Sequence, residues 1–250
     1  TNTIACSSSE LMGTQALLSD CRITRSSSLN FITVAYEQSG LEAVKGVSGL
    51  FDVHAAMPDA IEISVPEEPI VAGTPFPVTL QVVDAYGNPV EDGTGEVSLQ
   101  DAPPDAQSEL TSVAALVEDG TAQLELTLKR ALEVTYLSAS SDALAVDGLS
   151  MPIRVVYAAP TLIDVVIDET VPIVAGQEAG ARLRVFDAYR NPALGYEGTI
   201  SLNSEYEDIA SEDFRVMAFE LGEADAFFTL TTAVAANRLV VNLSLIHISE

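Results

Sequence analysis

The sequence predicts an all-β protein built from tandem antiparallel β-sandwiches. The first observation behind this prediction is a recurring block: Asp84-Ala85-Tyr86-Gly87-Asn88-Pro89 returns 103 positions later as Asp187-Ala188-Tyr189-Arg190-Asn191-Pro192. The flanking segments 69–73 and 95–99 return in the same register as 172–176 and 198–202. A repeat of about one hundred residues is the size of a small domain, so we expect domains joined end to end rather than a solenoid.

The second observation is apolar alternation in short segments separated by Gly, Pro, Asp and Ser. Val78, Leu80 and Val82 alternate with Thr79, Gln81 and Val83, for example. Period-two patterning with one apolar face is typical of strands in a two-sheet sandwich. The segment 142–146 has a helix-like pattern but is too short to form a stable helix. We expect strands over 61–65, 70–71, 76–83, 96–99, 110–117, 122–128, 132–138 and 152–156.

A second alignment extends the repeat to the N-terminal region, because Gly46-Val47-Ser48 matches Gly148-Leu149-Ser150 at an offset of 102. We therefore expect residues 1–57 to be the C-terminal part of a truncated repeat, with one strand over 29–36. The chain is read as a fragment, in which 58–159 is a complete repeat and 160–242 a repeat truncated at its C-terminal end. Residues 243–250 resemble a translated sequencing adaptor and are expected to form a tail.

Charge is the strongest compositional signal. The chain has 37 acidic and 11 basic residues and a formal net charge of −26. Such a field repels phosphate backbones and anionic lipid surfaces, which excludes nucleic acid as a partner. Hydrophobic residues make up 48% of the chain, enough for folded cores, but no apolar run is long enough for a membrane helix. We expect no membrane span in this fragment.

The two cysteines, Cys6 and Cys21, are too few for a zinc site, which needs four ligands or three and a water. We expect a disulfide between neighbouring strands, which would favour an oxidising compartment. Two buried thiols are the alternative.

The recurring block is interpreted as a structural turn motif formed by Asp84, Tyr86, Asn88 and Pro89 and, in the second copy, by Asp187, Tyr189, Asn191 and Pro192. The Asp carboxylate is placed to accept hydrogen bonds from N–H groups of the turn. The Tyr ring is expected to be buried over the end of the sandwich. The proline sets φ and cannot donate to a strand ladder.

The position after the tyrosine is Gly87 in one copy and Arg190 in the other. A residue with a Cβ atom is strained at positive φ, so this exchange predicts that the position does not require positive φ. The recurring Asn88 and Asn191 are expected to act through hydrogen bonds of their side chains.

Catalytic patterns are weak. Gly46-Val47-Ser48-Gly49 resembles half of a nucleophile elbow, but its second glycine is misplaced. His54 lies beside Val53 on an apparent strand, where a half-buried structural role is expected, and His247 lies in the predicted tail. No Ser-His-Asp or Cys-His set can be assembled. We therefore expect no catalytic residues and no enzyme activity.

Calcium is the one ligand for which the acidic loops supply candidate residues. The candidate ligands are Asp92 and Asp101 in one copy and Glu197 and Asp208 in the next. Calcium takes six to eight oxygen ligands, and none of these loops has EF-hand spacing. Solvated acidic loops with no cofactor are the alternative.

A family resemblance rests on Val71-Ala72-Gly73, then 84–90, then Gly95-Glu96-Val97-Ser98-Leu99. This pattern resembles the repeated bacterial immunoglobulin-like domains of invasin/intimin-type surface proteins. The resemblance implies immunoglobulin-like sandwiches in an extracellular stalk, and Arg190 departs from the usual glycine.

The resulting functional expectation is a non-enzymatic spacer or adhesion module of a bacterial cell-surface or secreted repeat protein. Its partners would be a surface ligand or neighbouring repeats. The alternative is an accessory array of a secreted multidomain enzyme, for example a polysaccharide-degrading one. Sugar binding by the repeats themselves is disfavoured, because the chain has no Trp and 6% aromatic residues.

Overall fold

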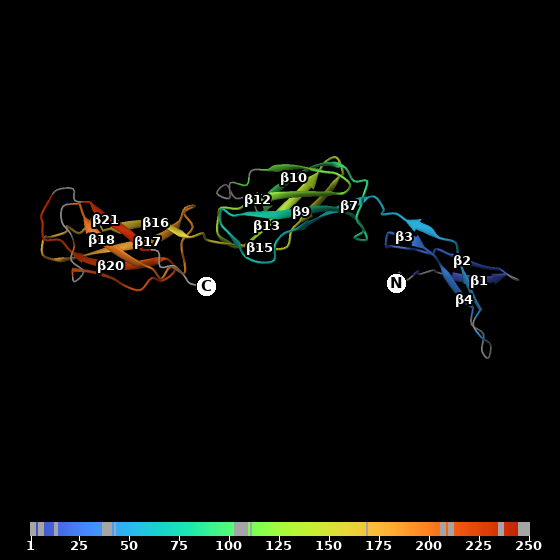
Figure 1. The fold of residues 1–250 in the computed structure, drawn as a ribbon, viewed down its shortest axis with the longest axis horizontal. Coiled ribbons are helices and arrows are strands. Elements are labelled where there is room, and N and C mark those ends of the chain that lie inside the picture. Colours follow the sequence, from blue (N-terminus) through green and yellow to red (C-terminus); the bar gives the residue numbers. More distant parts are fainter. Residues whose placement is uncertain are drawn as a thin grey trace.

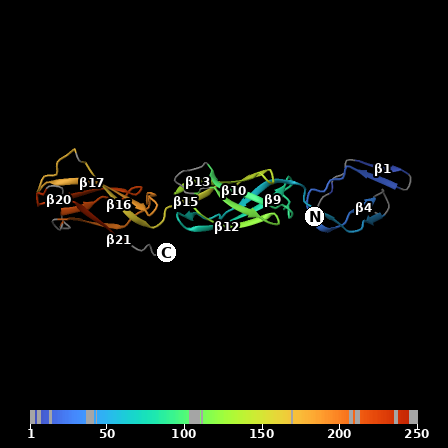
Figure 2. The same cartoon turned by 90° about the horizontal axis from the view of Figure 1, so that it is seen from above.

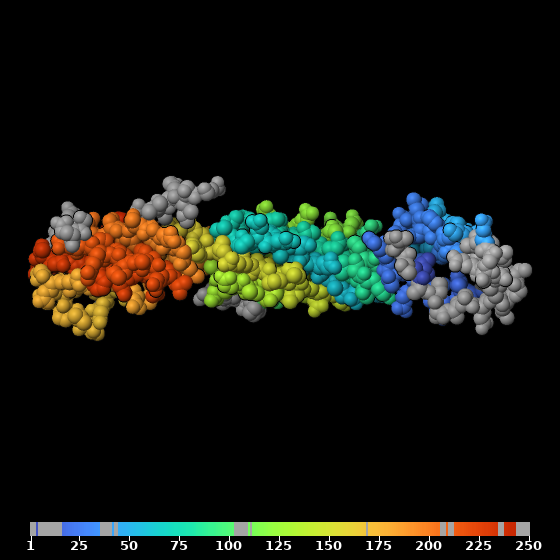
Figure 3. Space-filling view, turned by 90° about the horizontal axis from the view of Figure 1, so that it is seen from below, coloured from blue at the N-terminus to red at the C-terminus, as the bar shows by residue number. Residues whose placement is uncertain are grey.

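The computed structural model describes residues 4, 8–12, 15–36, 42, 44–102, 110, 112–168, 170–205, 209, 213–234 and 238–244. All elements that these residues form are β-strands. The strands make three bodies arranged in line, which we call the first module (8–53), the second module (58–156) and the third module (160–244) (Figures 1 and 3). The view from above in Figure 2 shows the same linear arrangement. The predicted all-β fold is confirmed, with two sheets each in the second and third modules.

The second module is a sandwich of two sheets. One sheet has the order β11-β10-β13-β15-β8, with β14 paired to β13, and the other has the order β12-β9-β7. The pairs are antiparallel except β15 with β8, which is parallel. The strands are β7 (Pro58–Ser64), β8 (Ile70–Val71), β9 (Pro75–Asp84), β10 (Gly95–Ala102), β11 (Val113–Val117), β12 (Thr121–Thr127), β13 (Leu132–Ser141), β14 (Val146–Leu149) and β15 (Ile153–Val156).

The core of the second module follows from the apolar alternation of its strands. On β9, Phe76, Val78, Leu80 and Val82 are buried between the sheets, while Thr79 and Gln81 are not. These side chains pack with residues of the opposite sheet, such as Leu99 and Leu137, in one hydrophobic cluster. Burying a side chain of this size contributes about 1.5–3 kcal/mol, so this face holds the two sheets together.

The third module repeats part of this arrangement. One sheet has the order β16-β17-β20-β19, and the other pairs β18 with β21. Phe228 on β20 and Leu202 on β18 belong to its hydrophobic core, which is a separate cluster from that of the second module. The strands are β16 (Pro160–Ile167), β17 (Glu178–Asp187), β18 (Thr199–Ser204), β19 (Phe214–Val216), β20 (Glu223–Thr229) and β21 (Leu239–Ser244).

The first module consists of three strand pairs, β1 with β2, β3 with β6, and β4 with β5. Its described residues contribute no side chain to the buried core. The strands are β1 (Ser8–Met12), β2 (Gln15–Ser19), β3 (Ser27–Asn30), β4 (Thr33–Tyr36), β5 (Val44–Val47) and β6 (Phe51–Val53).

One expectation about local structure is wrong. The single strand expected over 29–36 is divided at residues 31 and 32 into β3, which pairs with β6, and β4, which pairs with β5. The segment 142–146, which was expected to be too short for a stable helix, forms a turn that leads into β14. The sequence pattern did not predict β14. β14 has only four residues, and its Gly148 weakens the strand signal because a glycine carries no side chain to pack.

No helix among the described residues is long and apolar enough to cross a membrane.

Because the second and third modules have separate hydrophobic cores, shortening a core side chain in one module is expected to destabilise that module alone. Leu80 and Leu183 lie at equivalent positions, and both are fully buried. We expect Leu80→Ala to destabilise the second module by about 2–5 kcal/mol through lost transfer energy and a residual cavity, and Leu183→Ala to do the same to the third. Hydrogen exchange read by mass spectrometry localises each effect. If Leu80→Ala increased exchange in β17 and β20 as much as in β9 and β13, the two modules would unfold as one cooperative unit.

Candidate functional site

The recurring Asp-Ala-Tyr-x-Asn-Pro block lies at the joint between modules. At the first joint, the buried Asp84 carboxylate accepts hydrogen bonds through Oδ1 from the backbone N–H groups of Tyr86 and Asn88, both at 2.9 Å. Its Oδ2 accepts a hydrogen bond from the N–H of Ala56, in the link that enters the second module, at 2.8 Å. One carboxylate therefore holds both the turn and the link.

The Asn88 side chain connects this turn to the first module. Its Nδ2 donates to the Asp84 carboxylate and to the backbone carbonyl of Thr24, the latter at 2.7 Å. Its Oδ1 accepts from the backbone N–H of Ser26 at 2.9 Å. The amide thus pairs with the 24–26 backbone as a neighbouring strand would. A side-chain amide carries a donor and an acceptor side by side, as a peptide group does, so asparagine can make both bonds at once.

The second joint repeats these bonds. Asp187 accepts from the backbone N–H groups of Tyr189 and Asn191 and, through Oδ2, from Ala158 in the link. Asn191 Nδ2 donates to Asp187 and to the carbonyl of Lys129, and its Oδ1 accepts from the N–H of Ala131. The two copies of the motif therefore do the same thing, each one holding the preceding module. We call this set of bonds the joint clamp.

The tyrosines lie outside the cores, so the expectation that their rings are buried is wrong. Tyr86 is 52% exposed and Tyr189 is 39% exposed. The Tyr189 ring extends across the second joint onto Gly73 of the second module, where a Cβ atom would collide with it. Lys129 Nζ also lies 6.0 Å from the centre of this ring. The glycine leaves room for the ring, so Tyr189 packs between modules instead of within its own.

The residue after each tyrosine adopts positive φ, so the expectation drawn from Arg190 is also wrong. Gly87 has φ of 76° and Arg190 has φ of 67°. In both turns this residue donates its N–H to the carbonyl of the motif aspartate, and the aspartate N–H donates to the carbonyl of the following asparagine. A three-residue loop closed in this way is usually a turn followed by one left-handed residue. Arg190 tolerates the strain of about 1–2 kcal/mol. Its guanidinium also pairs with Asp164 at 2.9 Å.

The prolines end the turn without leaving a backbone N–H group that lacks a hydrogen bond. Pro89 and Pro192 form isolated bridges to Val83 and Phe186, and neither has an N–H group to satisfy. The next residues, Val90 and Ala193, return to the strand ladder and are buried.

Two opposing effects act on the pKa of Asp84. Burial of the carboxyl group raises its pKa, but the hydrogen bonds from the Asn88 side chain and from the N–H groups of Ala56, Asn88 and Tyr86 lower it by more. The net result is a pKa far below the usual value for aspartate. The carboxylate stays charged at neutral pH because the N–H groups around it replace the lost water.

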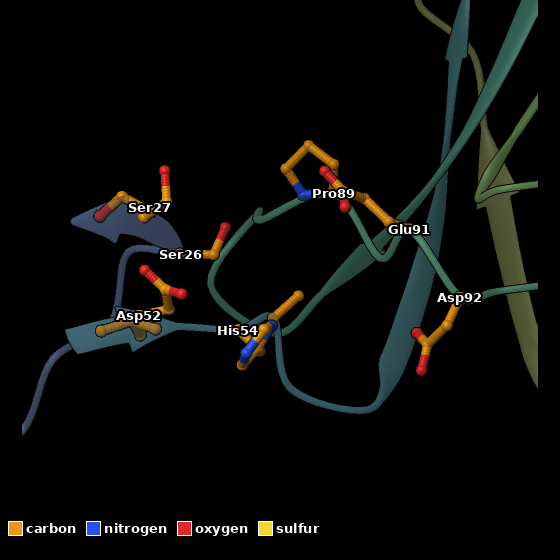
Figure 4. Close-up of a pocket in the computed structure, with 10 residues that line it drawn as sticks. Ser26, Ser27, Asp52, His54, Pro89, Glu91 and Asp92 are labelled. Atoms are coloured by element: carbon orange, nitrogen blue, oxygen red, sulfur yellow. The ribbon is translucent and has the colours of Figure 1, made fainter. Parts of the chain in front are cut away.

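The first joint also carries a cleft, lined by residues of both modules (Figure 4). It is formed by Ser26 to Ser28 and 52–55 on one side and by Pro89, Glu91 and Asp92 on the other. Figure 4 shows Asp52 and Asp92 on opposite sides of His54, so their carboxylates do not converge.

The structure does not bring the calcium candidates together. Asp92 lines the cleft, Asp101 is buried on β10, and Glu197 is exposed after the second joint, while Asp208 lies outside the described residues. Within the described ranges, no group of three or more His, Cys, Asp or Glu side chains could hold a metal ion.

The structure describes both weak catalytic candidates, His54 and Ser48. His54 follows β6 and is exposed, so the expectation of a half-buried histidine on a strand is wrong. The Ser48 hydroxyl accepts a hydrogen bond from the N–H of Ile32 and donates to the carbonyl of Gly49. Ser48 thus serves to join two backbone segments.

Cys21 is disulfide-bonded, and Cys6 lies outside the described residues.

Sequence reasoning missed the partners of the joint clamp. The partners of Asn88 and Asn191 are backbone atoms of residues 24, 26, 129 and 131, and a backbone atom leaves no side-chain signal in a sequence. Gly73 was detectable in principle, because Val-Ala-Gly recurs at 174–176 and both glycines have φ of 78°.

No protein-family model and no curated protein sequence matches the chain. Among solved structures, the Escherichia coli adhesin FdeC aligns with a TM-score of 0.44 and 18% identity, over 91% of this chain and 71% of that one. Surface layer protein SbsC, domains 1–6, aligns with a TM-score of 0.29 and 13% identity, over 98% of this chain and 39% of that one. A β-glycosidase from Bacteroides vulgatus aligns with a TM-score of 0.27 and 10% identity, over 74% and 24%. The function proposed below rests on contacts within the chain.

The lowered pKa of Asp84 predicts that the first joint weakens in acid. A carboxyl group whose pKa is lower in the folded than in the unfolded state stabilises the fold above its unfolded pKa of about 4, and this contribution is lost progressively below that pH. We expect Asp84→Asn to lower the melting temperature at neutral pH and the difference from wild type to shrink on acidification. Calorimetry across this pH range measures it, with Glu125→Gln as the control for net charge. A difference that does not change with pH would contradict the assignment.

The positive φ of Gly87 predicts that a side chain added at this position destabilises the protein. Gly87 has open space around it, so Gly87→Ala adds only backbone strain, and we expect a loss of about 1 kcal/mol in the free energy of unfolding. Gly49→Ala is the matched control, because Gly49 also has open space but does not have positive φ. Denaturant titration compares the two. Equal stabilities of the two variants would show that the turn does not need glycine.

Proposed function

We propose that the chain is a non-enzymatic spacer or adhesion module of a bacterial cell-surface or secreted repeat protein. The observation that carries this proposal is the joint clamp, present with the same bonds at both joints. A flexible linker leaves adjacent domains free to reorient, whereas these bonds fix each module to the backbone of the one before it. A chain of modules held in this way keeps its two ends apart, which is what a spacer must do.

The surface chemistry is consistent with an extracellular setting. A net charge of −26 keeps an extended protein soluble and discourages side-by-side association. The disulfide at Cys21 is of the kind that persists in oxidising compartments. The partners in this proposal are neighbouring repeats and a surface ligand.

The test is the solution shape of the full chain and of variants that lack the clamp. Asn88→Ala and Asn191→Ala each remove two hydrogen bonds across a joint, worth about 0.5–1.5 kcal/mol each. We expect small-angle X-ray scattering to give one extended shape for the wild type, and a smaller radius of gyration with a broader distance distribution for the double variant.

Asn242→Ala is the matched control, because Asn242 is exposed on β21. The control is expected to scatter like the wild type. A wild type that already scatters as freely jointed modules, or a double variant as extended as the wild type, would refute the spacer proposal.

The complete open reading frame separates this proposal from its rival. A cell-surface anchor or many further copies of the repeat would support a spacer, and an adjoining hydrolase domain would support an accessory array of a secreted enzyme.

A further inference from the structure

One sheet edge is open in the second module and covered in the third. β12 is the outermost strand of the sheet β12-β9-β7, and among the described residues no strand pairs with its outer edge. In the third module the counterpart of β12 is β20, and β19 pairs with the outer edge of β20 at residues 226–228. The same edge therefore accepts a strand in one copy of the repeat and lacks one in the other.

The side chains at the covered edge are better buried than those at the open edge. Ala226 and Phe228 on β20 are fully buried. The counterpart of Ala226 is Leu124, which pairs with Val78 as Ala226 pairs with Ala181. Leu124 packs against the core of the second module but is only half-buried. The preceding strand, β11, does not cover it, because β11 pairs with β10 in the opposite sheet.

The open edge presents the backbone groups of Gln123 and Glu125. The N–H of Val82 on β9 donates to the carbonyl of Gly120, directly before β12. Backbone groups alternate in direction along an antiparallel strand, so the even-numbered residues of β12 direct theirs toward β9 and the odd-numbered ones direct theirs outward. A row of outward N–H and C=O groups is a template for a further strand.

The sequence of β12 matches a second copy of itself in the antiparallel direction. About a two-fold axis at Leu124, Gln123 lies opposite Glu125 of the other copy, and their outward donors and acceptors meet in hydrogen bonds. Leu124 lies opposite itself in a non-hydrogen-bonded pair, where side chains approach closely, and so gains an apolar partner. Glu125 is the only charged residue of β12, and this register keeps its two copies apart.

We propose that β12 of one copy of the chain pairs with β12 of a second copy in this antiparallel register. The two copies use the same surface, so the contact is isologous and closes as a dimer. β9 runs from beside Gly73 at the second joint to Asp84 at the first joint, so the strands of this sheet follow the length of the chain. The two chains of the dimer therefore point in opposite directions.

The pairing goes beyond the proposed spacer role and does not require it. In the surface setting proposed above, chains that extend from two facing surfaces meet in the antiparallel orientation, and this last step does rest on the proposed function. The pairing itself is a property of the second module and is tested in solution.

The net charge of the whole chain opposes this association. Each copy carries −26, so two copies repel each other at low ionic strength. Salt screens this repulsion over a distance that falls from about 30 Å at 0.01 M to about 8 Å at 0.15 M. Pairing at β12, which carries a single charge, is therefore expected to strengthen as salt is added.

The first experiment measures the mass of the intact chain by sedimentation velocity and light scattering. Protein concentration is varied from micromolar to submillimolar at low and at physiological ionic strength. We expect the mass to rise from that of one chain, 26.4 kDa, to that of two chains and no further. A mass that stays at one chain overturns the proposal, and so does a mass that grows past two chains.

Two charge variants of Gln123 test the register. Gln123→Glu places like charges opposite each other at both symmetric positions, and we expect it to weaken the dimer about 2- to 30-fold. Gln123→Lys places opposite charges there and is expected to strengthen the dimer. Gln123 is exposed, so neither change disturbs the single chain.

Gln100 provides the matched controls, because it is exposed on β10 in the opposite sheet. Gln100→Glu and Gln100→Lys change the net charge by the same amounts away from the contact and are expected to shift the dimer much less. Equal shifts for the two positions, or a Gln123→Lys dimer weaker than the Gln123→Glu dimer, overturn the proposal.

A cross-link tests the position of the two-fold axis. The Cα atoms of a directly opposed, non-hydrogen-bonded pair lie about 4.5 Å apart, within the range of about 4.4–6.8 Å that a disulfide spans. We expect Leu124→Cys to form a disulfide-linked dimer on mild oxidation, with the 124–124 link identified by mass spectrometry. Gln100→Cys is expected to stay monomeric. Cross-linking that is absent in Leu124→Cys, or equal in both variants, overturns the proposal.

The pairing and the spacer role have separate tests, since none of these changes touches the joint clamp. Scattering from Gln123→Glu at concentrations where it is monomeric gives the shape of the single chain. A monomeric but extended wild type would overturn the pairing and leave the spacer proposal standing. A dimer of freely jointed chains would do the reverse.

Discussion

The structure depends on a buried carboxylate that is hydrogen-bonded to a buried amide at each joint. Asp84 and Asp187 are both buried and receive their hydrogen bonds from neutral N–H groups of the turn, of the link and of the neighbouring asparagine. Taking a charge out of water is costly unless such groups replace the water. The carboxylate therefore requires the turn, the link and the asparagine to be in place together.

This requirement couples local structure to the arrangement of the modules. The asparagine that satisfies the carboxylate has one further donor position and one acceptor, and both are used by the backbone of the preceding module. A turn that is correctly folded thus presents a group that matches the preceding module. At the second joint, Tyr189 also packs closely against Gly73 of the preceding module. The linear arrangement in Figure 1 follows from contacts of this kind repeated at each joint.

Tertiary contacts and the geometry of closed turns explain where the structure differs from the sequence-based expectations. The tyrosine rings were expected to be buried over the end of their own sandwich, but Tyr189 packs against Gly73 across the joint, and no periodicity within a module indicates that partner. Positive φ at Arg190 is not visible from residue type, because the turn closed between Asp187 and Asn191 imposes it on whichever residue stands there. β14 is short and contains a glycine, and that glycine is needed by the close approach of β7. For Tyr189 and for Gly148 of β14, the deciding contact is with a residue distant in sequence.

The sequence by itself determined the strands and the repetition. Alternating residues such as Val78, Leu80 and Val82 must share one face of a strand, so burial of that face follows from covalent geometry alone. The recurrence of the Asp-Ala-Tyr-x-Asn-Pro block at a fixed offset identified where equivalent turns lie. Only the tertiary structure decided what those turns do, because the partners of Asn88 and Asn191 are backbone N–H and C=O groups. Every residue carries such groups, and only the folded chain selects which of them meet the asparagine.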